Sequence, residues 1–153
     1  MNDQVLKEYC YLVNETFRFI EEHFESIVPA GKVDQGILLW TKDVFKKAEK
    51  LRTEGKAEEL ETLAENYLKY SLEYFKCNTP WQEVREDWRI CCNTILNTVQ
   101  LIANLSILLN SLNYDHAAEV TRLLGLDGEW KVCTVRSGYE IPNNAKGKLG
   151  LTV

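Results

Sequence analysis

Apolar residues recur every three or four positions along the first 126 residues, which is the spacing of amphipathic helices. The first such stripe predicts a helix over residues 3–28, with Asp3 as its N-cap and Pro29-Ala30-Gly31 as its stop. A second stripe predicts a helix that begins at Asp34 and is interrupted at Gly55. The chain is therefore expected to open with two long helices.

Two further long helices are expected after this interruption. The third covers residues 57–77 and carries two adjacent apolar stripes, so it should contact two neighbours. The fourth begins at the sequence TPWQ (79–82), where the threonine would be the N-cap, the proline the first helical residue and the glutamine the partner in a capping box. Its apolar spacing continues almost to Tyr114, and the pattern leaves open whether the helix is continuous or broken near Asn104 or Asn110.

The pattern changes after the fourth helix. A short fifth helix is predicted over residues 115–124, with Gly125 in the left-handed cap position and Leu126 folding back as its hydrophobic contact. Residues 129–136 have the composition of a strand, and Ser137-Gly138 could turn them onto residues 139–141 as a small hairpin. Residues 143–153 are expected to form a flexible tail.

The predicted fold class is all-α, within a single domain of 153 residues. Residues 1–126 should form a bundle of about four long antiparallel amphipathic helices plus the short fifth helix, with neighbours joined by short turns. Residues 127–153 should form a small β-hairpin-like or irregular C-terminal extension that ends in the tail.

Composition and cysteine content indicate an ordered protein of the cytoplasm. A chain with 45% hydrophobic residues, 27% charged residues and three prolines is not largely disordered. The N-terminus lacks the features of a targeting segment. Five cysteines, an odd number without a secretion signal, indicate reduced thiols in a cytosol-like compartment.

The net charge of −5 argues against a general binder of phosphate backbones and so disfavours nucleic acid as a partner. The charge is uneven, because residues 131–153 hold four cations and one anion. Whether this basic tail has a binding role stays open.

Residues 90–114 contain no charged side chain, but ten of these 25 residues are Asn, Gln, Ser or Thr, which is too polar for a membrane span. Four amides, Asn93, Asn97, Gln100 and Asn104, fall on one helix face. This face is either half-buried and hydrogen-bonded within the domain or a contact surface for another protein or a second copy. A contact surface requires exposed amides.

Aromatic side chains gather around the turn between the third and fourth helices, among them Trp81 and Trp88. Such residues serve either as core or as anchors of an interface. Nearby charges are mixed, which does not predict a basic groove for stacked nucleotide bases.

We interpret the chain as a non-enzymatic protein-binding module, such as an adaptor subunit, an inhibitor or an immunity-type protein, that binds another protein or itself. The candidate contact residues are Asn93, Asn97, Gln100, Asn104, Trp81 and Trp88.

One alternative is enzymatic. The segment from Arg18 to His23 resembles the Arg-x4-6-His element of the HEPN ribonucleases, which are all-helical and cleave RNA without a metal. The resemblance implies that Arg18 and His23 act as cation and general acid/base, with dimerisation doubling the set. The chain differs from that family in having Phe19 after the arginine and in carrying the element on its first helix.

Other chemistry is disfavoured by missing motifs. The sequence has no CxxC, no ExxH and two histidines, so neither a zinc nor a di-iron site is predicted. It also lacks a glycine-rich phosphate loop and an arrangement typical of a nucleophilic triad. Outside the ribonuclease alternative, the sequence predicts no catalytic residue, metal or cofactor.

Overall fold

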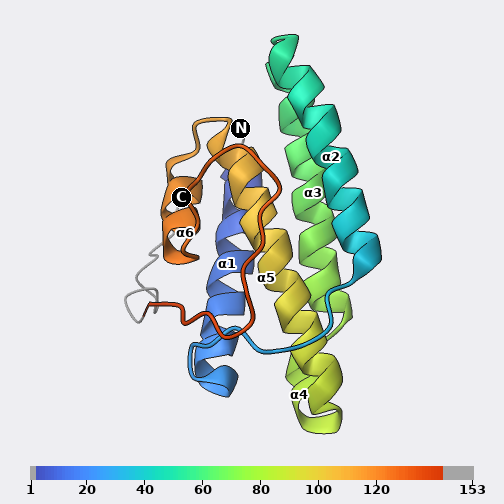
Figure 1. Ribbon diagram of the computed structural model, residues 1–153, viewed down its shortest axis with the longest axis vertical. Helices are drawn as coiled ribbons and strands as arrows, with labels where there is room; N and C mark the ends of the chain where they lie inside the picture. The colour runs from blue at the N-terminus through green and yellow to red at the C-terminus, as the bar shows by residue number, and fades with distance from the viewer. Residues whose placement is uncertain (1–2, 143–153) are drawn as a thin grey trace.

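The computed structural model describes residues 3–142, and within that range the predicted all-α class is confirmed. The helices in chain order are α1 (Asp3–Phe24), α2 (Gln35–Thr53), α3 (Ala57–Cys77), α4 (Pro80–Glu86), α5 (Trp88–Asn110) and α6 (Asp115–Leu123). Helix α5 contacts each of the other five and lies in the middle of the molecule (Figure 1). The predicted flexible tail, residues 143–153, lies outside the described residues.

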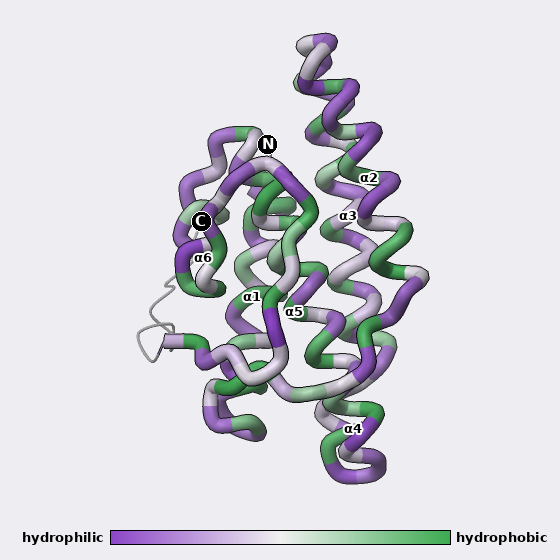
Figure 2. The backbone as a smooth tube through the Cα atoms, in the orientation of Figure 1, coloured by the Kyte–Doolittle hydropathy of each residue, from purple (hydrophilic) through white to green (hydrophobic). Residues whose placement is uncertain are grey.

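Helices α2 and α3 begin and end close to where the sequence places them. The Asp34 carboxylate accepts a hydrogen bond from the backbone N–H of Ile37 at 3.0 Å, so it is the N-cap of α2. Gly55 has a φ of 70° in the turn that reverses the chain into α3. The α2–α3 pair projects beyond the other helices at one end (Figure 1). Hydrophilic and hydrophobic residues alternate along both helices of the pair (Figure 2).

Helix α1 ends at Phe24, four residues before the predicted end. Glu25 and Ser26 adopt left-handed conformations with φ values of 54° and 65°. The backbone N–H of Ser26 donates to the carbonyl of Ile20 at 3.1 Å, which closes the helix end. The chain therefore leaves the helix early, and residues 26–34 run as a non-helical connection that we call the α1–α2 connection.

The predicted fourth helix is divided in two at Asp87, and not near Asn104 or Asn110. Asp87 has an extended backbone (φ −151°, ψ 91°), and its carboxylate accepts a hydrogen bond from the N–H of Ile90 at 3.2 Å. It is thus the N-cap of α5, which then continues through Asn104 to Asn110. The break was not predicted because a single non-helical residue barely disturbs the spacing of apolar residues.

The predicted capping box at the start of α4 does not form, although the helix does begin at Pro80. Thr79 adopts a left-handed conformation with a φ of 43°, and its hydroxyl makes no hydrogen bond to the helix backbone. It donates to the side-chain oxygen of Gln82 at 3.4 Å instead. Proline at the first helical position is sufficient for the start, because its φ is already helical.

Helix α5 is the core of the protein. By length and apolar composition it could cross a membrane, but 89% of its most apolar window is buried inside the structure. Deep in this core, the hydroxyl groups of Tyr9 and Ser106 lie 2.7 Å apart and satisfy each other. The apolar composition of α5 is therefore that of a core helix.

The predicted C-terminal hairpin is wrong in its pairing. No strand occurs within residues 3–142, and residues 139–141 pair with the α1–α2 connection instead of residues 129–136. Backbone hydrogen bonds join Val28 to Tyr139, Gly138 to Val28 and Ile141 to Ser26, each 2.8 Å long. The early end of α1 makes this backbone available, which local sequence does not reveal.

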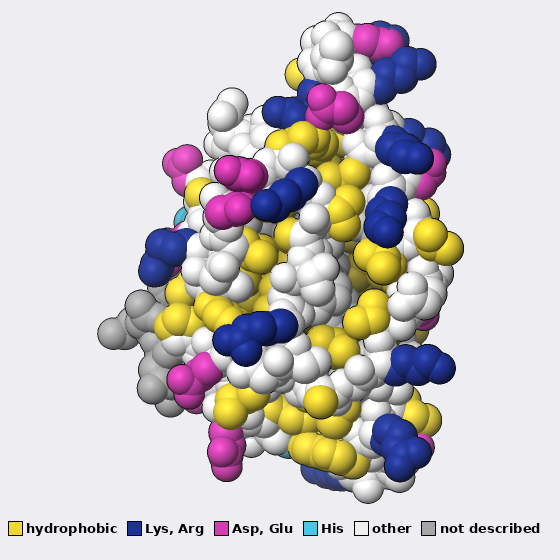
Figure 3. All heavy atoms as spheres, viewed as in Figure 1, with side chains coloured by type: hydrophobic (Ala, Val, Ile, Leu, Met, Phe, Trp, Pro, Cys, Tyr) yellow, Lys and Arg dark blue, Asp and Glu magenta, His cyan; other side chains and the backbone are white. Residues whose placement is uncertain are grey.

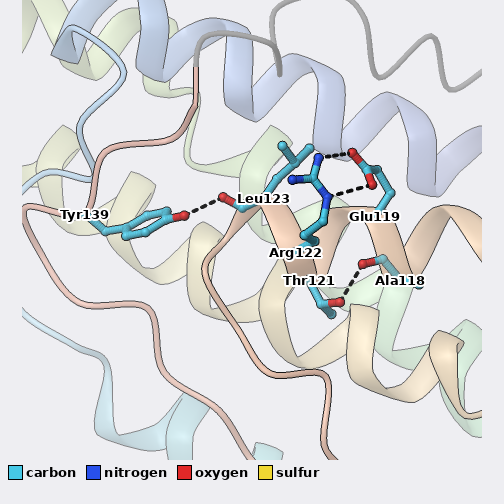
Figure 4. A network of polar contacts seen from close by, with 6 residues as sticks. All are labelled: Ala118, Glu119, Thr121, Arg122, Leu123 and Tyr139. Carbon is cyan, nitrogen blue, oxygen red and sulfur yellow. Dashed lines mark hydrogen bonds and ion pairs between the residues drawn. The ribbon is translucent and has the colours of Figure 1, made fainter.

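Helix α6 ends as predicted and also holds the extension. Gly125 has a φ of 71°, and the N–H of Leu126 donates to the carbonyl of Thr121 at 3.0 Å. The hydroxyl of Tyr139 donates to the carbonyl oxygen of Leu123 at 2.7 Å (Figure 4). A Cβ at Gly125 would lie 2.8 Å from the Tyr139 ring, so glycine permits this close approach as well as the turn.

Candidate functional site

The four amides that we predicted as a contact face are turned inward. We call Asn93, Asn97, Gln100 and Asn104 the amide row. Asn97, Gln100 and Asn104 have exposed fractions of 3%, 8% and 3%, and Asn93 is partly buried. The interpretation of these residues as a surface for an outside partner is therefore corrected, and the alternative of internal hydrogen bonding holds.

Two members of the amide row bind the C-terminal extension. Gln100 donates to the carbonyl of Val135 and accepts from its N–H, both at 2.8 Å. Asn104 donates to the carbonyl of Cys133 at 3.0 Å and accepts from its N–H at 2.8 Å. Each side-chain amide thus pairs with both polar groups of one backbone residue.

The other two members bind the backbone of the α1–α2 connection, where Asn97 bridges two residues and Asn93 accepts one bond. Asn97 donates to the carbonyl of Lys32 at 3.0 Å and accepts from the N–H of Asp34 at 2.8 Å. Asn93 accepts from the N–H of Lys32 at 2.7 Å. Because Asp34 is also the N-cap of α2, these bonds fix where α2 begins.

The spacing of the amide row matches that of an extended chain. Four residues of helix rise about 6 Å, and two residues of extended backbone span about 6.6 Å. Gln100 and Asn104 can therefore meet every second residue, Val135 and Cys133, while Asn93 and Asn97 meet Lys32 and Asp34. The amide row supplies the hydrogen bonds that a neighbouring strand would give, and it positions both non-helical segments.

Docking of the extension on α5 changes the chemistry of Cys133. Removal from water raises the pKa of its thiol to about 12, and nearby Asp127 acts in the same direction. Burial likewise raises the pKa of the Cys91 thiol to about 12. Cys77 is exposed.

We expect iodoacetamide at pH 8 to alkylate Cys133 and Cys91 at least about 100-fold more slowly than Cys77, because only the accessible thiolate reacts. Peptide mass spectrometry of timed samples measures the three rates. Asn104→Leu, which removes the amide that holds Cys133, should accelerate labelling of Cys133 and leave Cys91 unchanged. Equal rates at Cys133 and Cys77 in the unaltered protein would contradict the docked position of the extension.

The junction of α4 and α5 carries three exposed apolar side chains, Trp81, Trp88 and Ile90, and we call this region the tryptophan end. Their exposed fractions are 46%, 51% and 47%. Trp88 and Ile90 lie about 200° apart around α5, so they face different sides of that helix. Trp88 packs on Phe24 with ring centroids 4.8 Å apart, and Trp81 contacts Phe75 at 6.0 Å. Both indole rings are therefore held by the protein on one side while the other side faces solvent.

Cations and a pocket adjoin the tryptophan end. Trp81 and Arg85 lie one helical turn apart on α4, and Arg89 follows Trp88; both arginines are exposed. A pocket of about 500 Å³ lies beside Ile90, and its lining includes Tyr74, Asn78, Asn93 and Lys32. This end of the molecule thus combines aromatic faces and amides with charges of both signs, because Glu86 and Asp87 are exposed beside the two arginines.

The structure does not bring Arg18 and His23 together within the chain. Arg18 is exposed and pairs with Glu15, and the His23 ring lies against Phe19 with centroids 4.4 Å apart. Five residues of continuous helix place the two side chains about 140° apart around its axis. The ribonuclease hypothesis therefore gains no support from the geometry. Among residues 3–142, no three His, Cys, Asp or Glu side chains gather as metal ligands.

Comparison with known proteins found similarity to part of an aminoacyl-tRNA synthetase. The chain is 27% identical over 141 residues to methionine–tRNA ligase 1 of Alkaliphilus oremlandii, a match that covers 92% of this chain and 26% of the ligase. It is 31% identical over 108 residues to methionine–tRNA ligase 1 of Bacillus cereus, covering 71% of this chain and 20% of the ligase. The chain thus spans about a quarter or less of these relatives. No family model matches it.

Proposed function

We propose that this chain is a helical RNA-binding domain that contacts transfer RNA through unpaired bases at the tryptophan end. The observation that carries the proposal is the presence of two half-exposed, firmly packed tryptophans in a chain similar over most of its length to methionine–tRNA ligases. Exposed aromatic faces are the usual platforms for bases of RNA loops.

The proposal concerns recognition and not the complete ligase reaction, because the chain spans only 26% of the first relative's length. The name of the relatives includes transfer RNA as a substrate. The loops of transfer RNA contain unpaired bases, which can stack on an exposed indole ring. Stacking holds the base, and Arg85 and Arg89 supply positive charge for neighbouring phosphates. In the adjoining pocket a base edge would meet the side-chain oxygen of Asn78 and the side-chain nitrogen of Asn93, whose other amide atoms bond to Tyr74 and Lys32.

This proposal revises the expectation that disfavoured nucleic acid as a partner. A net charge of −5 opposes binding driven by the phosphate backbone alone. Base stacking is a local interaction, however, and it is compatible with an acidic protein when cations lie beside the aromatic rings. The net charge therefore argues against binding through the phosphate backbone alone, and not against RNA as a ligand.

Protein binding is the second candidate, now confined to Trp81 and Trp88 because the amide row is buried. Tryptophans that pack against their own protein on one side and are exposed to solvent on the other are also common anchors of protein interfaces. The partner would then be another protein or a second copy of this chain. Either function is consistent with the cytoplasmic location that the sequence predicts.

The test is direct titration of the protein with three RNAs. They are a methionine tRNA, the seven-nucleotide single strand of its anticodon loop, and a fully paired duplex of the same length as that loop strand. We expect the tRNA and the loop strand to bind and quench tryptophan fluorescence, since a stacked base contacts the indole ring. The duplex should bind more weakly and quench little. Absence of binding to both loop-containing RNAs would overturn the proposal and leave protein binding as the remaining candidate.

A further inference from the structure

Charge is segregated among the long helices, and α2 is the positive one. Helix α2 carries five cations and two acidic residues, whereas α1 and α3 each carry two cations and five acidic residues. A space-filling view shows Lys and Arg side chains following the α2 side of the molecule (Figure 3). The overall charge of −5 therefore conceals one basic surface.

Three lysines, Lys42, Lys46 and Lys50, form a stripe on the outside of α2 that we call the lysine stripe. They are four residues apart, so they lie on one helix face with about 6 Å between neighbours along the axis. All three are exposed.

The other cations of α2 have acidic partners on the same helix. Lys47 pairs with Asp43 at 3.1 Å, and Arg52 pairs with Glu49 at 3.1 Å. These pairs neutralise charge locally, whereas the lysine stripe faces solvent as a row of positive charges.

A shallow groove runs beside the lysine stripe, between α2 and the C-terminal extension. It measures about 450 Å³, and its lining includes Lys42, Lys46, Lys131 and Trp130, together with the carboxylate of Glu49. Its floor is packed from both sides, because Trp130 stacks on Phe45 at 5.0 Å and the Arg52 guanidinium lies 4.2 Å from the centre of the Trp130 ring. The extension thus forms the second wall of the groove. Lys131 on this wall pairs with Asp127 at 3.1 Å and Glu129 at 3.7 Å, so the positive charge of the groove comes mainly from α2.

The lysine stripe leads away from the tryptophan end. Gln35, the first residue of α2, lines the same pocket as Ile90 and Asn93. From Gln35 the stripe begins about 10 Å along the helix at Lys42 and ends about 22 Å along it at Lys50. An RNA loop held at the tryptophan end would therefore have its stem within reach of this face.

We propose that the lysine stripe binds the phosphate backbone of the double-helical stem whose loop is bound at the tryptophan end. This inference rests on the proposed function. Lysine suits the task because its compact charge on a flexible chain contacts phosphates without reading sequence. The stripe sets orientation and contributes affinity that depends on salt, while the tryptophans contact the bases.

The experiment compares two RNAs, the anticodon stem-loop of a methionine tRNA and its isolated seven-nucleotide loop strand, at salt concentrations from 50 to 200 mM. The variant is K42Q/K46Q/K50Q, and the matched control is K7Q/K69Q/K76Q, which removes three cations from α1 and α3. From 50 to 200 mM salt, the affinity of the unaltered protein for the stem-loop should fall by a factor about 20 to 40 times larger than the affinity of the variant does. This is the salt dependence that three phosphate contacts contribute. The control should behave like the unaltered protein.

Binding of the isolated loop strand distinguishes the two proposals. The lysine variant should retain that binding, which also reports that it is folded. If both triple variants lose stem-loop affinity and salt dependence equally, only general charge is involved and the lysine stripe is not a site. If the loop strand binds but the stem adds nothing, this inference fails while the proposed function stands; if neither RNA binds, both fail.

Discussion

Replacing Gln100 with leucine is expected to lower the free energy of unfolding by about 2–6 kcal/mol, because it strands two buried backbone groups that each cost roughly 1–3 kcal/mol without a partner. Gln100 donates to the carbonyl of Val135 and accepts from its N–H, and Val135 is almost completely buried. Leucine fills similar volume but pairs with neither group. Urea denaturation followed by circular dichroism measures the change.

The matched control for this prediction is Gln82→Leu, since Gln82 is exposed on α4 and should change stability by less than about 0.5 kcal/mol. A second comparison comes from iodoacetamide labelling of Cys133, which the Gln100 variant should accelerate. Unchanged stability together with unchanged labelling would mean that Gln100 does not hold the extension.

Replacing Trp81 or Trp88 with alanine is expected to weaken binding of the anticodon loop strand by about 5- to 150-fold each, the range that one base–aromatic stack contributes. Both rings are packed on one side and open on the other, so truncation removes the stacking face. Phenylalanine at the same position should restore part of the affinity, because it keeps a flat aromatic face. Fluorescence anisotropy of labelled RNA gives the constants.

Leu39→Ala is the control for the tryptophan variants, because Leu39 is 65% exposed on α2 and lies outside the tryptophan end. Loss of an exposed apolar side chain there should leave RNA affinity unchanged. Urea denaturation of each tryptophan variant separates lost stacking from lost folding. Equal affinity in all variants would show that the tryptophans do not contact RNA and would favour their use as anchors for a protein.

Local pattern predicted those helices whose ends are decided by local chemistry. Asp34 and Gly55 mark the two ends of α2 as expected, because a cap and a left-handed turn act within a few residues. The end of α1 was missed because Pro29 is a stronger sequence signal than Glu25 or Ser26, and neither of these residues usually adopts a positive φ. The division at Asp87 was missed because apolar spacing continued across it.

The candidate site was predicted in part. The exposure of Trp81 and Trp88 could not be derived, because aromatic residues occur in cores as well as on binding surfaces, although their gathering at one turn was visible. The amide row was recognised and offered as a contact surface, with internal hydrogen bonding as the alternative. Its actual partners, Lys32 and Val135, come from segments more than 60 and 30 residues away in sequence, and no local pattern identifies such contacts.

The amide row also bears on the order in which the protein folds. Residues 26–28 and 139–141 pair across more than 100 residues of chain, and the amide row joins both of their segments to α5. Contacts so distant in sequence form late, because closing the intervening chain costs entropy that only an assembled helical core can offset. The extension should then be the last part to order and the first to open, as a unit whose backbone amides exchange with deuterated solvent before those of α5.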